Sequence, residues 1–209
     1  LREVGDSLFT EGITVGSVGL PDTRLGADES AFPTVEVRRA FWDQLRSELL
    51  ANPAVEAVSI TTAVPFTRVR RETVVVPGPE GGESLDVPAG FVDPAWFRML
   101  GIEPVEGRLV SEQDHRAGEE VVVVNRSFAN RWLVGGALGR TVEVVAAEGS
   151  LMPVRVVGVV PDLWMDGVGG DEPAGIYRPF TQAGSVNRDD RFDRRELRYA
   201  RVMIRGRDG

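Results

Sequence analysis

The sequence predicts an α+β fold, and two patterns carry this prediction. An amphipathic helical pattern stands between two β-branched runs near the start of the chain, and short strand-like segments alternate with a short helix and glycine turns over residues 121–180. With 209 residues, of which 42% are hydrophobic, the chain can bury roughly 70% of its extended-chain surface. That is enough for one core or two small ones, so we expect one or two domains.

The first predicted elements are a strand, a helix and a second strand. Residues 12–20 alternate apolar and polar side chains in a broken pattern that indicates a strand. Thr34 is placed to cap a helix that ends near Leu50. Its apolar face is expected to consist of Val37, Phe41, Leu45 and Leu49. Arg38 is expected on another face, and the β-branched run from Val55 predicts the second strand.

A hairpin-like region and two short helices are predicted next. Residues 65–92 contain two strand candidates, separated by prolines and a glycine pair. Asp93, followed by a proline, is placed to cap a short helix that Gly101 ends. Ser111 with Asp114 predicts a further helical turn, although a capping box would have Glu in the place of this Asp.

Most of the remaining strands are predicted in the second half of the chain. A strand at 120–124 leads into a helix that runs to Leu133, with Asn125 as its expected N-cap. Glycines after this helix are expected to end it and to form a turn. Further strands are expected at 141–145, 154–160, 175–179 and 197–204.

Composition excludes several classes of partner and site. The chain has 24 basic and 32 acidic residues, a net charge of -8, so we do not expect it to bind nucleic acid. It has no cysteine, which excludes disulfides and thiolate sites. No apolar run approaches the roughly 18 residues that cross a bilayer. Because the chain begins without Met or a signal sequence and stops in a loop-like GRDG, we expect a segment of a longer protein.

No catalytic or cofactor-binding residue is predicted. His115 is the one histidine and stands in a polar segment, which favours a surface position over a general base. No second histidine exists to activate a serine, and no serine has a nucleophile-elbow context. Paired carboxylates such as Glu119 and Glu120 are interpreted as solvated. The sequence therefore does not predict an enzyme.

The loop at 162–172 is a candidate contact surface. Its aspartates partly match a calcium-binding loop, but Trp164 occupies a ligand position and Pro173 stands in the place of the closing Glu. No metal site is therefore expected. If Trp164 and Met165 project outward beside Asp166, they mark an interface, because exposed large apolar side chains tend to do so.

Three spaced motifs together resemble a known family. They are PAWFRMLGIEPVEGRLVSEQD at 94–114, VVVVNRSFANRWLVGGALGRTVEV at 121–144, and PVRVVGVVPDL followed by GIYRPF within 153–180. The chain resembles the periplasmic core domain of MacB-like (FtsX-type) ABC transporter permeases, in particular their duplicated orphan-permease branch. The resemblance extends over nearly the whole chain.

The resemblance implies a domain division and a hinge. Residues 1–66 and 196–209 would form a porter-like α/β subdomain built from both chain ends, incomplete at its C-terminus. Residues 67–195 would form an inserted small α/β subdomain. The two crossings between them, 65–79 and 187–195, are the hinge candidates.

The resemblance also implies a function and partners. The domain would lie outside the inner membrane, in the periplasm, and couple cytoplasmic ATP hydrolysis through transmembrane helices to the export or extraction of a substrate. Its partners would be transmembrane helices of the same polypeptide, an ABC-type ATPase, and a second permease copy or a periplasmic adaptor. No cofactor is implied.

Two alternatives remain open on the sequence alone. One is a free-standing periplasmic binding or chaperone module with an apolar groove formed by Trp132, Leu133, Trp164 and Met165. The other is a carboxylate-dependent hydrolase that uses Asp162, Asp166 or Asp171. Convergence of these side chains in the fold would support either one.

Overall fold

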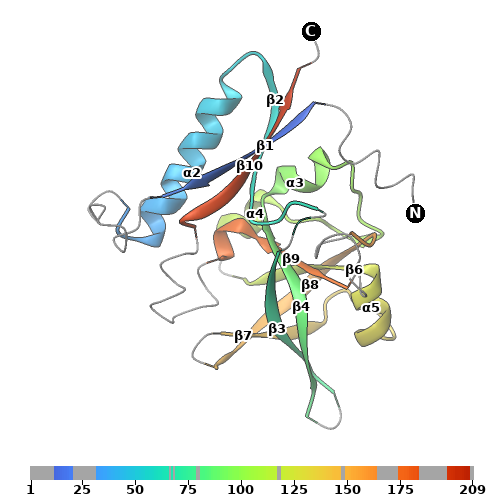
Figure 1. Ribbon diagram of the computed structural model, residues 1–209. Helices are drawn as coiled ribbons and strands as arrows, with labels where there is room; N and C mark the ends of the chain where they lie inside the picture. The colour runs from blue at the N-terminus through green and yellow to red at the C-terminus, as the bar shows by residue number, and fades with distance from the viewer. Residues whose placement is uncertain are drawn as a thin grey trace.

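The computed structural model contains two β-sheets, with helices packed against them (Figure 1). It describes residues 12–20, 32–65, 67, 69–78, 81–116, 119–146, 149–163, 174–183 and 197–207, the side chains of residues 115 and 116 excepted. No described helix is long and apolar enough to cross a membrane.

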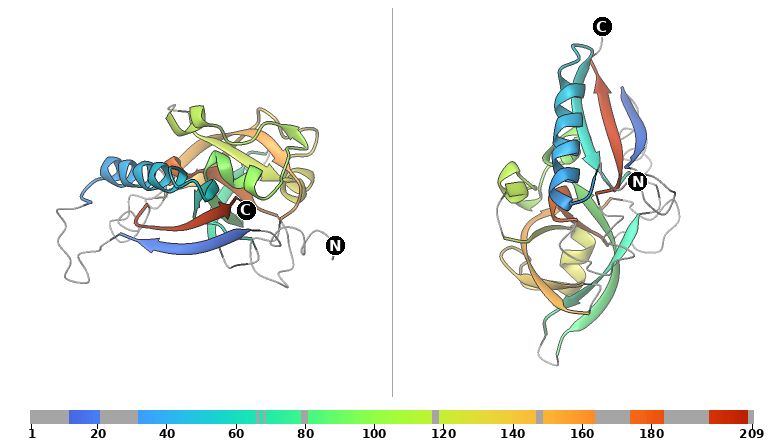
Figure 2. Two further views of the ribbon diagram at one scale, coloured as in Figure 1. Left: turned by 90° about the horizontal axis from the view of Figure 1, so that it is seen from above. Right: turned by 90° about the vertical axis from the view of Figure 1, so that its left-hand side faces the viewer.

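The smaller sheet is assembled from segments that are far apart in the sequence. It contains β1 (Ile13–Gly19), β2 (Val55–Thr61) and β10 (Tyr199–Gly206), and β10 lies in the middle with an antiparallel partner on each side. Helix α2 (Val35–Leu50) packs on one face and α3 (Pro94–Met99) on the other (Figure 2). Alternation along β2 and β10 explains this, because successive side chains of a strand point to opposite faces.

Helix α2 begins as predicted, and the predicted face is only partly the one that packs on the core. The Thr34 hydroxyl accepts a hydrogen bond from the backbone N–H of Val37, which confirms the N-cap. The centre of the buried face is Trp42, 2% exposed, whose indole N–H donates to the Leu197 carbonyl at 2.6 Å. Arg38 is also buried, whereas Val37 is 39% exposed. Phe41, Leu45 and Leu49 pack against the core as predicted. The prediction was wrong for Val37 and Arg38 and did not include Trp42, because a tryptophan with a polar partner sets the rotation of the helix.

The larger sheet closes on itself. Its strands are β3 (Arg70–Val76), β4 (Glu83–Val92), β5 (Glu106–Gly107), β6 (Val121–Asn125), β7 (Thr141–Val145), β8 (Leu151–Val160) and β9 (Ile176–Pro179). They are ordered β5-β8-β6-β9-β4-β3-β7, and β7 also pairs with β8. The first half of β8 pairs with β7 and its second half with β6 and β5. The strands from β8 round to β7 thus form a closed barrel with β5 attached.

Strand β6 shows how the barrel is packed. Its four valines are all buried: Val122 and Val124 join one hydrophobic cluster, and Val121 and Val123 join the other. The second cluster includes Trp96 and other side chains of α3. Strand β6 is therefore covered on both faces, as its continuous apolar run predicts. The other described helices are α4 (Glu112–Arg116), α5 (Arg126–Trp132) and the 3-10 turn η3 (Phe180–Gln182).

The α+β class and most element positions were predicted, but the closed barrel was not. The division at residues 66/67 and 195/196 stays a prediction. One hinge candidate needs correction, because residues 70–76 of the 65–79 crossing form β3, which is paired with β4 and β7. A strand held on both sides is a poor hinge, so any hinge there lies before β3. The crossing at 187–195 lies outside the described residues.

Two glycines allow β5 to lie close against its partner strand β8. Gly107 and Gly158 are register partners, and a Cβ added at Gly158 would lie 2.0 Å from the Arg108 carbonyl oxygen. We expect Gly158→Ala to lower the free energy of unfolding by about 2–3 kcal/mol, because backbone must shift to relieve the overlap. Gly16→Ala is the control, since a Cβ at Gly16 meets nothing within 4 Å. Urea unfolding that gives equal stabilities for the two variants would contradict this packing.

Candidate functional site

The predicted contact surface cannot be assigned a position. Trp164, Met165 and Asp166 lie outside the described residues, as does Asp171. Asp162 is described, and its carboxylate accepts hydrogen bonds from the backbone N–H and hydroxyl of Ser127, both at 2.8 Å. These bonds fix Asp162 at the first turn of α5. Within the described part of the chain, both carboxylate oxygens of Asp162 thus accept hydrogen bonds that hold the start of α5.

Neither open alternative gains a site from the described residues. Leu133, proposed to line an apolar groove, is a core residue with 2% exposure. Trp132 packs on Phe128 and donates a hydrogen bond to Glu83 at 3.3 Å. Among the described side chains, no three potential metal ligands gather at one place.

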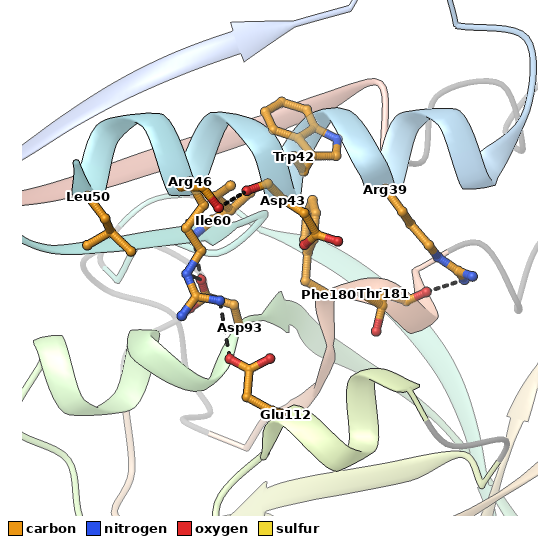
Figure 3. Close-up of a pocket in the computed structure, with 11 residues that line it drawn as sticks. Arg39, Trp42, Asp43, Arg46, Leu50, Ile60, Asp93, Glu112, Phe180 and Thr181 are labelled. Carbon is orange, nitrogen blue, oxygen red and sulfur yellow. Dashed lines mark hydrogen bonds and ion pairs between the residues drawn. The ribbon is translucent and has the colours of Figure 1, made fainter.

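The candidate site is a cleft between α2 and the barrel. It has a volume of about 450 Å³ and is bounded by α2 on one side and by the β4–α3 junction, α4 and η3 on the other (Figure 3). Its lining residues are Arg39, Trp42, Asp43, Arg46, Ser47, Leu50, Ile60, Asp93, Glu112, Phe180 and Thr181. The lining combines buried aromatic and aliphatic walls with both signs of charge. Its volume is in the range of small-molecule sites, which often lie between packed units, but its lining is more polar than is usual for them.

Asp93 forms one wall of the cleft and ties the two sheets together. Only 4% exposed, it caps α3 by accepting bonds from the N–H groups of Ala95 and Trp96, both at 3.0 Å. The same carboxylate accepts from the Ser59 hydroxyl at 2.8 Å and the Ile60 N–H at 3.0 Å, both on β2. The predicted cap is confirmed, and its second role at the edge of β2 was missed. Four donors around one carboxylate satisfy it fully.

Two arginines of α2 reach across the cleft to the barrel side. Arg46 donates to Glu112 of α4 at 3.2 Å and lies 4.0 Å from Asp93. Arg39 donates to the Thr181 backbone carbonyl in η3. Trp42 meets Phe180 edge to face, with ring centroids 6.0 Å apart. The contacts across the cleft are therefore mostly side-chain contacts.

A buried charge cluster lies near the end of the barrel. Arg178 of β9 is 1% exposed, bonds Glu120 at 2.8 Å and lies 3.7 Å from the Glu72 carboxylate, with its guanidinium over the Phe91 ring. Glu72 is 3% exposed, and neither of its carboxylate oxygens has a hydrogen-bond partner within the described parts of the chain. The interpretation of Glu120 as solvated holds only in part, because its side chain is 23% exposed and is bonded to an arginine from a strand distant in the sequence. The sequence contains one signal for this charge cluster, which is the arginine at position 178 in a strand that is otherwise apolar.

Asp114, which follows Glu112 in α4, is held in place by hydrogen bonds from a charged and a polar neighbour. Burial alone would raise the pKa of Asp114, but hydrogen bonds from Arg108 at 2.6 and 2.8 Å and from Ser111 at 2.7 Å outweigh it, so this pKa is lowered. A lowered folded-state pKa contributes stability that is present above the unfolded-state pKa and is lost as the pH falls through the folded-state pKa.

Asp114→Asn is therefore expected to be destabilising at neutral pH and progressively less so in acid. We expect a loss of about 1–2 kcal/mol at pH 7, since the bonds to a charged acceptor are replaced by weaker ones. The difference from the parent chain should shrink as the pH falls below about 4, where unfolded aspartate protonates. Urea unfolding of both proteins across this range measures it. A difference that stays constant down to the acid limit would contradict the role of the charge.

Comparison with known proteins places this architecture in a family. A family model described as the MacB-like periplasmic core domain matches residues 9–209. The chain is similar to the extracellular domain of the ABC-type transporter YknZ from Gram-positive bacteria, with 16% identity, a TM-score of 0.59, and coverage of 94% of this chain and 84% of that chain. It is also similar to the periplasmic region of MacB from Actinobacillus actinomycetemcomitans, with 17% identity, a TM-score of 0.58, and coverage of 97% and 77%.

At these identities the two structures establish a shared fold and no more. Membership of the family rests on the family model. No curated protein sequence matches the chain. Domains of this family belong to transporter permeases rather than to typical enzymes. The chain therefore belongs to the MacB-like periplasmic core domain family and is an extracytoplasmic domain of an ABC transporter permease.

Proposed function

We propose that this domain couples ATP hydrolysis in the cytoplasm to movement outside the membrane, and that this movement exports or extracts a substrate. Family membership implies transmembrane segments and an ATPase partner. Transmission of movement requires bodies that are each rigid and that shift against one another. A second permease copy or a periplasmic adaptor would receive the movement.

The observation that carries the proposal is the separation of the two sheets. No described strand belongs to both, and each sheet completes its own hydrogen-bonded order. At one end the sheets are joined by the Asp93 carboxylate and by a backbone hydrogen bond from Thr62 to Phe91 at 2.9 Å. Along the rest of the cleft, the contacts are those of the Arg39 and Arg46 side chains with the barrel side. Side-chain contacts of this kind reform more readily than a shared β ladder, so the cleft is where we expect the bodies to shift.

A reversible cross-link across the cleft tests the proposal. This chain has no cysteine, so Arg46→Cys and Glu112→Cys are introduced into a full permease and ATPase from which any cysteine outside this domain has first been replaced. A bismaleimide with a cleavable spacer then joins α2 to α4. In proteoliposomes with its ATPase, the cross-linked permease should lose ATP-driven transport and most of its coupled ATP hydrolysis. Cleavage of the spacer should restore both.

The matched control places the same cross-link inside one body. Glu119 and Arg155 form an exposed ion pair at 2.5 Å, with Arg155 in β8 of the barrel. Glu119→Cys with Arg155→Cys should cross-link without any effect on ATP hydrolysis or transport. If complete cross-linking of the cleft pair leaves both activities unchanged, the proposed shift across the cleft is wrong.

A further inference from the structure

Some charged groups of the cleft are satisfied by the protein itself. The Asp93 carboxylate has four donors, and Glu112 is paired with Arg46. These residues form the walls of the cleft and have little unused capacity for a charged ligand.

Three other polar groups of the cleft are left without a matching partner. Arg39 gives one bond to a neutral carbonyl, its Nε is buried without an acceptor, and no described carboxylate lies within 4 Å of it. The hydroxyl of Thr181 is buried and has no hydrogen-bond partner among the described residues. Asp43 lies one helical turn after Arg39 and makes no side-chain hydrogen bond or ion pair with any described residue. Figure 3 shows its carboxylate pointing from α2 into the cleft.

The unused groups define two adjacent subsites of opposite charge. Arg39 and Thr181 offer donors suited to a carboxylate, and Asp43 offers an acceptor suited to an ammonium group. Residues four apart on a helix have Cβ atoms about 5–6 Å apart, so one small molecule can bridge Arg39 and Asp43. A simple anion would be repelled by Asp43, and a simple cation by Arg39. The combination therefore favours a zwitterion.

We propose that the cleft binds a small zwitterion of the amino-acid class with an apolar side chain. The carboxylate of the ligand lies at Arg39 and Thr181, and its ammonium group lies at Asp43. The apolar side chain packs on the wall formed by Leu50, Ile60 and Phe180, which line the same cavity. This site is independent of the coupling proposed above, because it requires only the cleft as it stands in one conformation.

Binding of L-phenylalanine and two single-charge analogues to the chain tests the site. Titrations followed by backbone amide NMR should give saturable shifts around residues 39–47 and 180–182. Phenethylamine lacks the carboxylate and 3-phenylpropionate lacks the ammonium group, so each should bind at least about tenfold more weakly, as expected for one lost charge-assisted hydrogen bond. No saturable shift in the cleft, or equal binding of either analogue, overturns the proposal.

Asp43→Asn supplies the specific control on the ammonium subsite. It should weaken L-phenylalanine binding about tenfold and abolish the preference over 3-phenylpropionate, because the repulsion of the lone carboxylate disappears. Glu48→Gln removes a charge from an exposed position of the same helix, outside the cleft, and should bind as the parent does. Both positions are exposed, so both variants should fold. A preference that survives Asp43→Asn contradicts the assignment.

Discussion

Asp93→Ala should lower the free energy of unfolding by about 3–4 kcal/mol. The substitution removes the side-chain acceptor of four donors. The Trp96 N–H keeps the Asp93 backbone carbonyl at 3.1 Å, but the N–H groups of Ala95 and Ile60 and the Ser59 hydroxyl lose their acceptor. A lost N-cap costs about 1 kcal/mol, and each buried donor left unsatisfied raises the cost further. The separate costs do not simply sum. Denaturant unfolding with far-UV detection measures the loss. Because the residue joins β2 to α3, the unfolding transition should also broaden if the sheets begin to separate independently.

The control for Asp93 is an N-cap residue that does not also connect its helix to a strand. Thr34→Ala removes the N-cap of α2, which satisfies a single N–H at 3.3 Å on an exposed turn, and should cost about 1 kcal/mol. Asp93→Asn keeps one acceptor oxygen and should fall between the two. If Asp93→Ala is no worse than Thr34→Ala, then the carboxylate acts only as a cap and does not hold the sheets together.

Arg178→Leu is expected to be about as damaging, at about 3–5 kcal/mol, for a different reason. It removes the cation from a buried cluster and leaves Glu72, 3% exposed, with an uncompensated charge. Glu120 is less affected, because its side chain is 23% exposed and can be hydrated. The loss should therefore come mainly from Glu72.

A double substitution separates charge from packing. Arg178→Leu with Glu72→Leu removes both buried charges, so it should recover a large part of the stability lost by Arg178→Leu alone. Glu72→Leu alone should cost less than Arg178→Leu, since Arg178 keeps Glu120. If the stability losses of the two single variants simply sum in the double variant, the two charges, which lie 3.7 Å apart, are not energetically coupled.

The parts of the fold that sequence patterns predicted are those with local causes. Thr34, Asp93 and Asn125 were all identified as N-caps, and each accepts a bond from an N–H two or three residues ahead. Capping depends on a side chain and its own turn, so one short stretch of sequence contains the whole signal. The buried valines of β6 were predictable for the same reason.

The features that escaped prediction depend on partners distant in the sequence. Trp42 is buried because its indole N–H meets the Leu197 carbonyl, and Arg178 is accommodated because Glu72 and Glu120 come from other strands. Closure of the barrel depends on the pairing of β7 with β3, in which Val144 is the register partner of Val74. The cleft is likewise formed by segments that periodicity cannot bring together. Asp43, which has no side-chain partner in the part of the chain that the structure describes, resembles any exposed carboxylate of a helix.

The central place of β10 in the smaller sheet sets an order of events when the chain is first made. The barrel strands, β3 to β9, are contiguous in the sequence, so they can pair as soon as they have crossed the membrane. Strands β1 and β2 cross earlier, yet neither pairs with the other, and both must wait for β10. Until then the edges of β1 and β2 lack strand partners, although α2 can already pack against β2. A chaperone that meets the nascent domain outside the membrane would therefore find its target in the first strands and α2.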